Sequence, residues 1–126
     1  MNKRVLSIGN CDYDNGSIRK MLEQTFKADL LMADDLNEAL TTLRKEPVDL
    51  VVVNRHVEVD GSEGLDIIRQ LKAEPEFAQL PMMLVTNYPD YQEQAISLGA
   101  APGFGKAALY SEQTRERLGM FLGEKA

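Results

Sequence analysis

Residues 50–53 read Leu-Val-Val-Val and include no polar residue. A strand with one solvent-exposed face alternates apolar and polar residues, whereas a strand that is covered on both faces is apolar throughout. Continuously apolar strands are typical of parallel sheets, because the helices that connect parallel strands pack on both faces of the sheet. We therefore predict that residues 50–53 form a central strand of a parallel sheet.

The chain on either side of this strand alternates between strand and helix patterns. Short apolar runs predict four more strands, at residues 3–8, 28–33, 82–86 and 101–104. Apolar residues that recur every three or four positions predict helices at about residues 18–26, 36–43, 65–73, 91–98 and 111–122. Ser17 and Asp35 are the expected N-caps of the first two helices. Residues 9–16 are rich in turn-forming types, so we expect a loop there.

Five strands that alternate with five helices predict one α/β domain of the (βα)5 kind, a doubly wound parallel sheet in a three-layer sandwich. The 126 residues fit a single domain, here residues 1–126, and no linker or internal repeat divides them. The arrangement expected at this size is flavodoxin-like, with strand order 2-1-3-4-5. Ligands bind such sheets at the carboxyl edge between strands one and three. The loops at residues 9–16 and 54–64 are therefore the candidate functional loops.

Composition excludes several classes of function. The chain has 20 acidic and 14 basic residues, and its net charge of -6 repels the phosphate backbone of nucleic acids. No apolar stretch approaches the roughly 20 residues that span a membrane, and the amino-terminal apolar run is too short for a signal peptide. The single cysteine, Cys11, cannot form an internal disulfide. We expect a cytoplasmic protein that binds neither nucleic acid nor membrane.

The polar residues of the candidate loops match no catalytic motif. The only histidine, His56, and the only cysteine, Cys11, fall in different loops, so neither a catalytic triad nor a zinc site is indicated. The glycine spacing fits neither a dinucleotide fingerprint nor a P-loop. Asp12 and Asp14 offer oxygen ligands that suit Mg²⁺ or Ca²⁺, but two acids in a turn are a weak signal. We therefore expect no enzymatic activity.

Three stretches resemble the receiver domains of response regulators, the CheY-like domains of two-component systems. GLDIIRQLKAEPEFAQLPMMLVTN, residues 64–87, resembles their third helix, the following loop and their fourth strand. DLVVVN at residues 49–54 resembles their third strand, and SLGAAPGFGK at residues 97–106 resembles the segment around their fifth. The resemblance extends from about Lys3 to Lys106. It implies a module of phosphorelay signal transduction.

The resemblance also implies which positions would carry the receiver chemistry. Asn54 stands where receivers have the phosphoryl-accepting aspartate, and Gly9 and Asn10 stand at their acidic pair. Thr86 matches the switch hydroxyl and Lys106 the lysine. An amide is no nucleophile for phosphoryl transfer, and the Mg²⁺ that supports this transfer is held by carboxylates. The resemblance therefore implies a pseudo-receiver that is not phosphorylated and in which Mg²⁺ binding is lost or weak.

The position of the switch aromatic also departs from the receiver pattern, and the matching lysine needs another partner. Gly103 is nearest to the position of the switch aromatic on the fifth strand, and Phe104 follows one residue later. Lys106 has no phosphoryl group to contact, and an ammonium in a crevice must be paired or hydrated. We expect Lys106 to bond the side-chain oxygen of Asn54 or to reach Asp12.

Three functions stay open at this point. The first, which we favour, is a signalling module that acts by protein–protein interaction. The resemblance to receiver domains implies the surface from about Tyr91 to Leu122 for this contact, with a homodimer as one outcome. The second is a phosphorelay receiver in which Asp12, Asp14 or Asp60 replaces the missing carboxylates. The third is a small-molecule or metal binder at the crevice between strands one and three.

Overall fold

The five predicted strands form one parallel sheet. The structure is a computed structural model that describes residues 2–57 and 59–123. Neighbouring strands pair in parallel in the order β2-β1-β3-β4-β5, which confirms the predicted flavodoxin-like order. The strands are β1 (Arg4–Ile8), β2 (Asp29–Ala33), β3 (Leu50–Asn54), β4 (Met82–Val85) and β5 (Ala101–Phe104).

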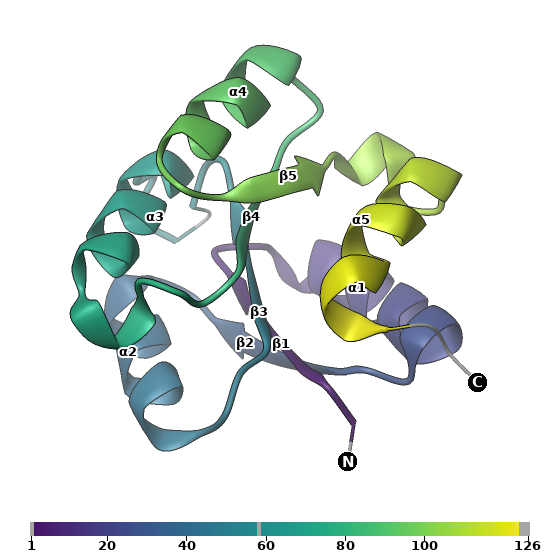
Figure 1. Cartoon of the computed structure of the whole chain (residues 1–126), viewed down its shortest axis with the longest axis horizontal. Coiled ribbons are helices and arrows are strands. Elements are labelled where there is room, and N and C mark those ends of the chain that lie inside the picture. The colour runs from purple at the N-terminus through teal and green to yellow at the C-terminus, as the bar shows by residue number, and fades with distance from the viewer. Residues whose placement is uncertain (1, 58, 124–126) are drawn as a thin grey trace.

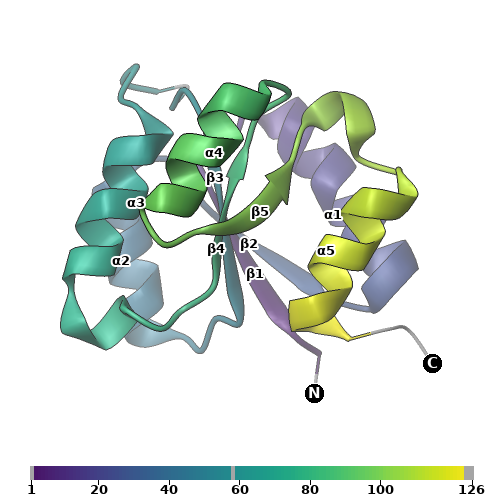
Figure 2. The same cartoon turned by 45° about the horizontal axis from the view of Figure 1, so that its top comes forward.

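Helices cover both faces of this sheet, as Figures 1 and 2 show. One face is covered by α1 (Asp12–Phe26) and α5 (Glu112–Leu122), and the other by α2 (Leu36–Lys45), α3 (Gly64–Ala73) and α4 (Pro89–Ser97). Two short 3-10 helices, η1 (Pro75–Phe77) and η2 (Lys106–Ala108), lie in the connections that follow α3 and β5. The result is the predicted three-layer sandwich.

The apolar run of β3 is buried on both sides. Leu50 and Val52 lie in the core beneath α1 and α5, whereas Val51 and Val53 lie in the core beneath α2 and α3. All four side chains are at most 1% exposed. Burial of such a side chain contributes about 1.5–3 kcal/mol. The continuous apolar pattern therefore has the predicted cause.

The first helix begins earlier than the sequence predicts. It starts at Asp12, so the expected N-cap Ser17 lies inside it, and the expected loop of residues 9–16 shrinks to residues 9–11. The physical reason is long-range, because the buried side chain of Asn15 bonds to Ser7 and to the backbone of residue 10. These bonds outweigh the turn preference of Asn15-Gly16. Asp12 and Asp14 thus lie in the first helical turn, where carboxylates interact favourably with the helix dipole.

Other boundaries agree with the prediction to within one or two residues, the usual spread between assignments. Asp35 caps α2 as expected, because its carboxylate accepts a hydrogen bond from the Glu38 N–H at 2.9 Å. The fourth helix begins at Pro89 rather than at Tyr91, since the fixed φ of proline suits the first helical position. Asn54 is the last residue of β3 rather than the first of a loop.

Among the described residues, no helix has both the length and the apolar character that a membrane crossing requires.

Candidate functional site

A polar pocket of about 260 Å³ lies at the carboxyl ends of β3 and β4, on the same edge of the sheet as the predicted crevice between strands one and three but beside that crevice. It contains three of the residues that the sequence singles out, namely Asn54, Thr86 and Lys106. The remaining lining residues are Arg55, His56, Val85, Asn87 and Tyr88. None of the lining residues is acidic. We call this the Asn54 pocket.

Asn54 is 8% exposed and acts as a hydrogen-bond donor. Its Nδ2 atom donates to the main-chain oxygen of His56 at 2.5 Å and to that of Gly9 at 3.2 Å. These bonds tie the loop after β3 to the loop after β1. A carboxylate has no proton to donate, so an ionised aspartate would place oxygen against oxygen at both contacts. The local structure is therefore built for an amide at this position.

Gly9 occupies a position that disfavours a side chain. Its φ is +76°, a conformation that residues with a Cβ rarely adopt, and an added Cβ would lie 2.9 Å from Cγ2 of Val57. A carboxylate side chain at this position would therefore be strained by both backbone and packing.

Asn10 belongs to a neutral buried network rather than to a cation site. Its Nδ2 donates to the Ser7 hydroxyl at 2.8 Å, and that hydroxyl donates to Oδ1 of Asn15 at 2.6 Å. Nδ2 of Asn15 in turn donates to the main-chain oxygen of Asn10 at 3.1 Å. Within the part of the chain that the structure describes, Oδ1 of Asn10 is buried without a partner. The sequence did not predict this network, because Ser7 and Asn15 carry no motif.

Lys106 pairs with neither of the two predicted residues, Asn54 and Asp12, but with Asp14. Its Nζ lies 2.6 Å from Oδ2 of Asp14, rather than against Asn54 or Asp12. The prediction was wrong because α1 begins at Asp12, so that Asp14 faces η2 while Asp12 lines a neighbouring pocket. The Cys11 thiol donates to the same oxygen of Asp14 at 3.3 Å.

The ion pair affects the acidity of Asp14. Burial raises the pKa of this carboxyl, but the hydrogen bonds from Lys106 and Cys11 and the charge of Lys106 outweigh burial and leave the pKa below its ordinary value. Asp14 is therefore ionised and already occupied by a cation.

Thr86 uses both its backbone and its side chain in structural contacts. Its N–H donates to the main-chain oxygen of Phe104 at 3.0 Å, which extends the pairing of β4 with β5. Its hydroxyl oxygen accepts from the Tyr88 N–H at 3.2 Å and so supports the turn into α4. This contact is the local one that threonine often makes at a strand end.

Arg55, Tyr88 and Tyr91 form a cluster beside the Asn54 pocket, and Arg55 and Tyr88 line it. The Arg55 guanidinium lies 4.8 Å from the ring centroid of Tyr91 and 5.7 Å from that of Tyr88. The two rings meet edge to face, with 6.2 Å between centroids. Such contacts are favourable cation–π interactions. The sequence did not reveal the cluster, since Arg55 and Tyr88 are far apart along the chain.

His56 and Asp60, the other candidates, do not complete a reactive site. His56 forms an isolated antiparallel bridge with Glu63 at the base of the loop after β3. The Asp60 carboxylate accepts from the Ser62 N–H at 2.9 Å, and the hydrogen bonds of Ser62 lower its pKa. Asp60 is not among the residues that line the Asn54 pocket.

The donor set around Asn54 does not fit a Mg²⁺ ion. The carbonyls of Gly9 and His56 accept hydrogen bonds from Asn54, and the Asp14 carboxylate is paired with Lys106. Mg²⁺ requires oxygen ligands in near-octahedral geometry. Among the described residues, no group of three or more His, Cys, Asp or Glu side chains could hold a metal.

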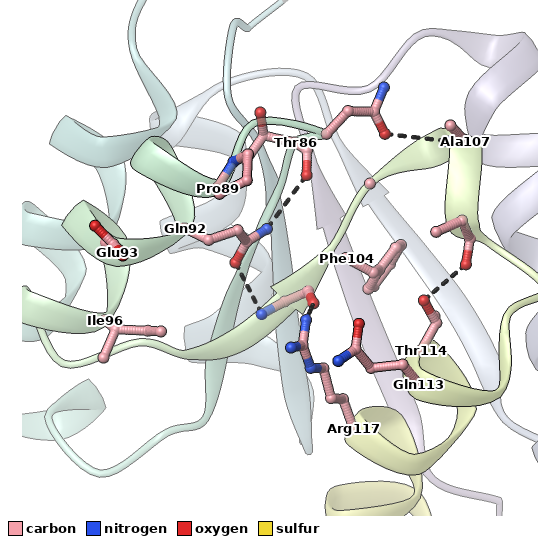
Figure 3. Close-up of a pocket in the computed structure, with 14 residues that line it drawn as sticks. Thr86, Pro89, Gln92, Glu93, Ile96, Phe104, Ala107, Gln113, Thr114 and Arg117 are labelled. Carbon is pink, nitrogen blue, oxygen red and sulfur yellow. Dashed lines mark hydrogen bonds between the residues drawn. The ribbon is translucent and has the colours of Figure 1, made fainter.

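A larger groove of about 500 Å³ lies across β5, between α4 and α5. Figure 3 shows Gln92 of α4 and Arg117 of α5 reaching toward β5 from opposite sides of this groove. Ile96 and Phe104 contribute apolar surface to it. Most of its lining residues belong to the surface from Tyr91 to Leu122 that the resemblance implies for protein contacts, and Thr86, Asn87 and Pro89 extend the groove beyond that surface. We call it the α4–α5 groove.

Comparison with known proteins identifies the fold. No protein-family model and no curated protein sequence matches this chain. Among solved structures, the chain is similar to a putative response regulator from Chloroflexus aurantiacus, with 16% identity, a TM-score of 0.82 and coverage of 97% of this chain and 98% of the other. A response regulator from Thermotoga maritima matches with 23% identity, a TM-score of 0.77 and the same coverage.

A third neighbour is a sensor protein from Polaromonas, with 18% identity, a TM-score of 0.82 and coverage of 97% of both chains. Identities this low establish the fold and nothing finer. The chain has the fold of response-regulator receiver domains, as its sequence pattern predicts.

Proposed function

We propose that this protein is a receiver-like module of cytoplasmic signal transduction that acts by protein–protein interaction without aspartyl phosphorylation. The observation that carries the proposal is the role of Asn54, whose amide donates to two main-chain carbonyls at the phosphoacceptor position. A carboxylate could not make these bonds. Asn54 is therefore a structural amide that connects two loops of the receiver fold.

The surrounding residues support the loss of phosphoryl transfer. Phosphoryl transfer needs a nucleophile and a divalent ion that neutralises the developing charge. Gly9 has no side chain and a backbone conformation that disfavours one, Asn10 is held in a neutral network, and Asp14 is bound to Lys106. The site thus provides neither component, and we assign no enzymatic activity and no metal cofactor to it.

The interaction surface that we propose is the one from Tyr91 to Leu122, with the α4–α5 groove at its centre. Ile96 is 44% exposed there, whereas Phe104, which also lines the groove, is 3% exposed. Exposed apolar residues inside a groove with polar rims are typical of protein contacts. The partner is a signalling protein or a second copy of this chain.

Phosphorylation can be tested directly on the intact chain. The purified protein is incubated with acetyl phosphate and Mg²⁺, and intact mass is measured before and after treatment with acid. We expect no phosphoryl adduct, while an active receiver domain treated in parallel is labelled. Stoichiometric, acid-labile labelling of this chain would overturn the proposal.

The same experiment addresses the phosphorelay alternative. The observation that favours this alternative is the ionised Asp14 carboxylate, which lies 2.6 Å from the ammonium of Lys106. Labelling that is lost in Asp14→Asn, Asp12→Asn or Asp60→Asn would identify the substitute acceptor. Absence of labelling in the wild-type chain excludes all three.

A further inference from the structure

The pairing of β5 with β4 is interrupted at one place. Met83 pairs with Ala101 and Val85 with Phe104, so two steps along β4 correspond to three steps along β5. The extra length is a β-bulge, and it contains Pro102, which has no N–H to donate. Backbone groups beside the bulge therefore need partners from outside the sheet.

The side chain of Gln92 bonds to backbone groups of both strands beside the bulge. Its Oε1 accepts from the Gly103 N–H at 2.9 Å, and its Nε2 donates to the main-chain oxygen of Leu84 at 2.9 Å. The carboxamide thus lies between β4 and β5 and joins a backbone N–H of β5 to a backbone oxygen of β4 through two hydrogen bonds. Figure 3 shows the Gln92 side chain pointing from α4 toward β5. Gln92 belongs to α4, so this helix is tied to both strands at once.

Arg117 holds the other side of the same residue. Its Nη1 donates to the main-chain oxygen of Gly103 at 2.6 Å. The N–H and the carbonyl of Gly103 are therefore bonded to side chains from α4 and α5 respectively. One residue of β5 links the two helices that flank the α4–α5 groove.

Only glycine is compatible with this arrangement. A Cβ at position 103 would lie 2.3 Å from the Leu84 oxygen and 3.1 Å from Oε1 of Gln92. Any larger residue, including an aromatic one, would displace the carboxamide. The glycine at this position and the glutamine of α4 are therefore one structural unit.

The same unit reaches the Asn54 pocket. Nε2 of Gln92 also lies 3.4 Å from the main-chain oxygen of Thr86, whose N–H is bonded to Phe104. The backbone of Thr86 is thus held from both sides. Because both backbone groups of Thr86 are bonded, this residue is restrained. A change inside the Asn54 pocket therefore does not move α4 through Thr86.

We propose that Gln92 and Arg117 clamp α4 and α5 onto Gly103, so that the α4–α5 groove keeps one conformation whatever the state of the Asn54 pocket. Gln92 and Arg117 are positioning residues in this proposal, and Gly103 is the point at which they meet. The groove is then a permanent binding surface rather than a switched one. The proposal deepens the proposed function and rests on its choice of surface.

Amide hydrogen exchange of the full chain, measured by NMR, tests the clamp. In the wild type we expect the Gly103 amide to exchange slowly and α4 and β5 to show no microsecond-to-millisecond exchange. In Gln92→Ala the Gly103 amide should exchange about tenfold faster, which corresponds to about 1.4 kcal/mol. Exchange broadening should appear in α4 and β5, while α1 and β2 stay unchanged.

Two further variants make the result decisive. Gln94→Ala removes the same side chain from an exposed position of the same helix, so we expect wild-type behaviour. Gln92→Glu keeps the shape and accepts from Gly103, but it cannot donate to Leu84, so its effect should fall between wild type and Gln92→Ala. If Gln92→Ala does not fold, the exchange rates of the Gly103 amide in wild type and in Gln92→Glu test the clamp by themselves.

A Gly103 amide that exchanges rapidly in the wild type, or α4 and β5 that interconvert between conformations there, would overturn the clamp. Equal exchange in wild type and Gln92→Glu would do the same. No partner is needed for these measurements, so their failure leaves the proposed function standing, and labelling by acetyl phosphate would leave the clamp standing.

Discussion

Asn54 connects two loops through hydrogen bonds that only its amide nitrogen can donate. Its position at the end of the central strand lets one side chain reach the carbonyls of Gly9 and His56. The residue is therefore part of what holds the carboxyl edge of the sheet together. A substitution here should change stability as well as chemistry.

We expect Asn54→Asp to destabilise the protein and not to create a phosphorylation site. The buried carboxylate loses both donor contacts, at a cost of about 1–3 kcal/mol. Gly9 and Asn10 still provide no carboxylate for Mg²⁺. Urea unfolding and mass measurement after acetyl phosphate treatment check the two halves of this prediction.

The matched control is Asn37→Asp, which introduces the same charge at an exposed position of α2. It should change the free energy of unfolding by no more than about 0.5 kcal/mol. Efficient labelling of Asn54→Asp would show that the acidic pair lies elsewhere than at Gly9 and Asn10.

The Asp14–Lys106 pair should make stability depend on acid pH. The folded-state pKa of Asp14 is below its ordinary value of 3.8, so the unfolded chain binds the proton more tightly than the folded chain. The stabilisation is thus complete above about pH 4 and is lost as pH falls through the lower, folded pKa. Urea unfolding of wild type and Asp14→Asn between neutral and acid pH should show this loss only in the wild type.

Lys106→Met provides the second arm of a double-mutant cycle for this pair. It removes the partner and retains most of the aliphatic side chain, so we expect the acid-dependent component to shrink as in Asp14→Asn. Two single variants whose effects simply add would show that the pair is uncoupled.

At the scale of elements, the start of α1 is the clearest case of tertiary control. Gly16 lies inside this helix and has no atom within 4 Å of the position that a Cβ would take. We therefore expect Gly16→Ala to stabilise the protein by about 0.5–1 kcal/mol, because alanine restricts the unfolded chain and favours the helix. Thermal or urea unfolding measures the change.

Gly61→Ala is a matched control for Gly16→Ala. Gly61 has a φ of +72°, so the same substitution should destabilise the chain there. A loss of stability in Gly16→Ala would mean that residue 16 lies in a turn and that α1 begins later.

At the scale of the whole molecule, the α4–α5 groove should determine partner binding. We expect Ile96→Arg to weaken the complex with the signalling partner, or the homodimer, by at least about tenfold, because a charge enters the apolar part of the groove. The affinity for a signalling partner, isolated by affinity capture on this chain, is measured by isothermal titration. The affinity of the homodimer is measured by light scattering of the isolated chain over a range of concentrations.

Val59→Arg places the same charge on a side chain that is 64% exposed, in the loop after β3 and outside the groove. We expect wild-type affinity from it. Equal weakening by both substitutions would indicate a general charge effect, and no weakening by Ile96→Arg would place the interface elsewhere.

The sequence by itself determined the layers and the order of the strands. The run at residues 50–53 is apolar because both faces of β3 are covered, and this relation between pattern and burial is local to the strand. The positions of Asn54, Thr86 and Lys106 at one edge follow from the same topology, since the carboxyl ends of parallel strands meet there.

Only the tertiary structure decided which side chains are partners. Lys106 pairs with Asp14 because α1 begins at Asp12, and α1 begins there because the buried Asn15 side chain bonds to Ser7 on β1 and to the main chain just after β1. Gln92 bonds to the backbone of Leu84 and of Gly103, which lie next to its side chain only in the folded chain. Hydrogen bonds act over about 3 Å, so their partners are set by packing between elements distant in sequence, which local residue patterns do not encode.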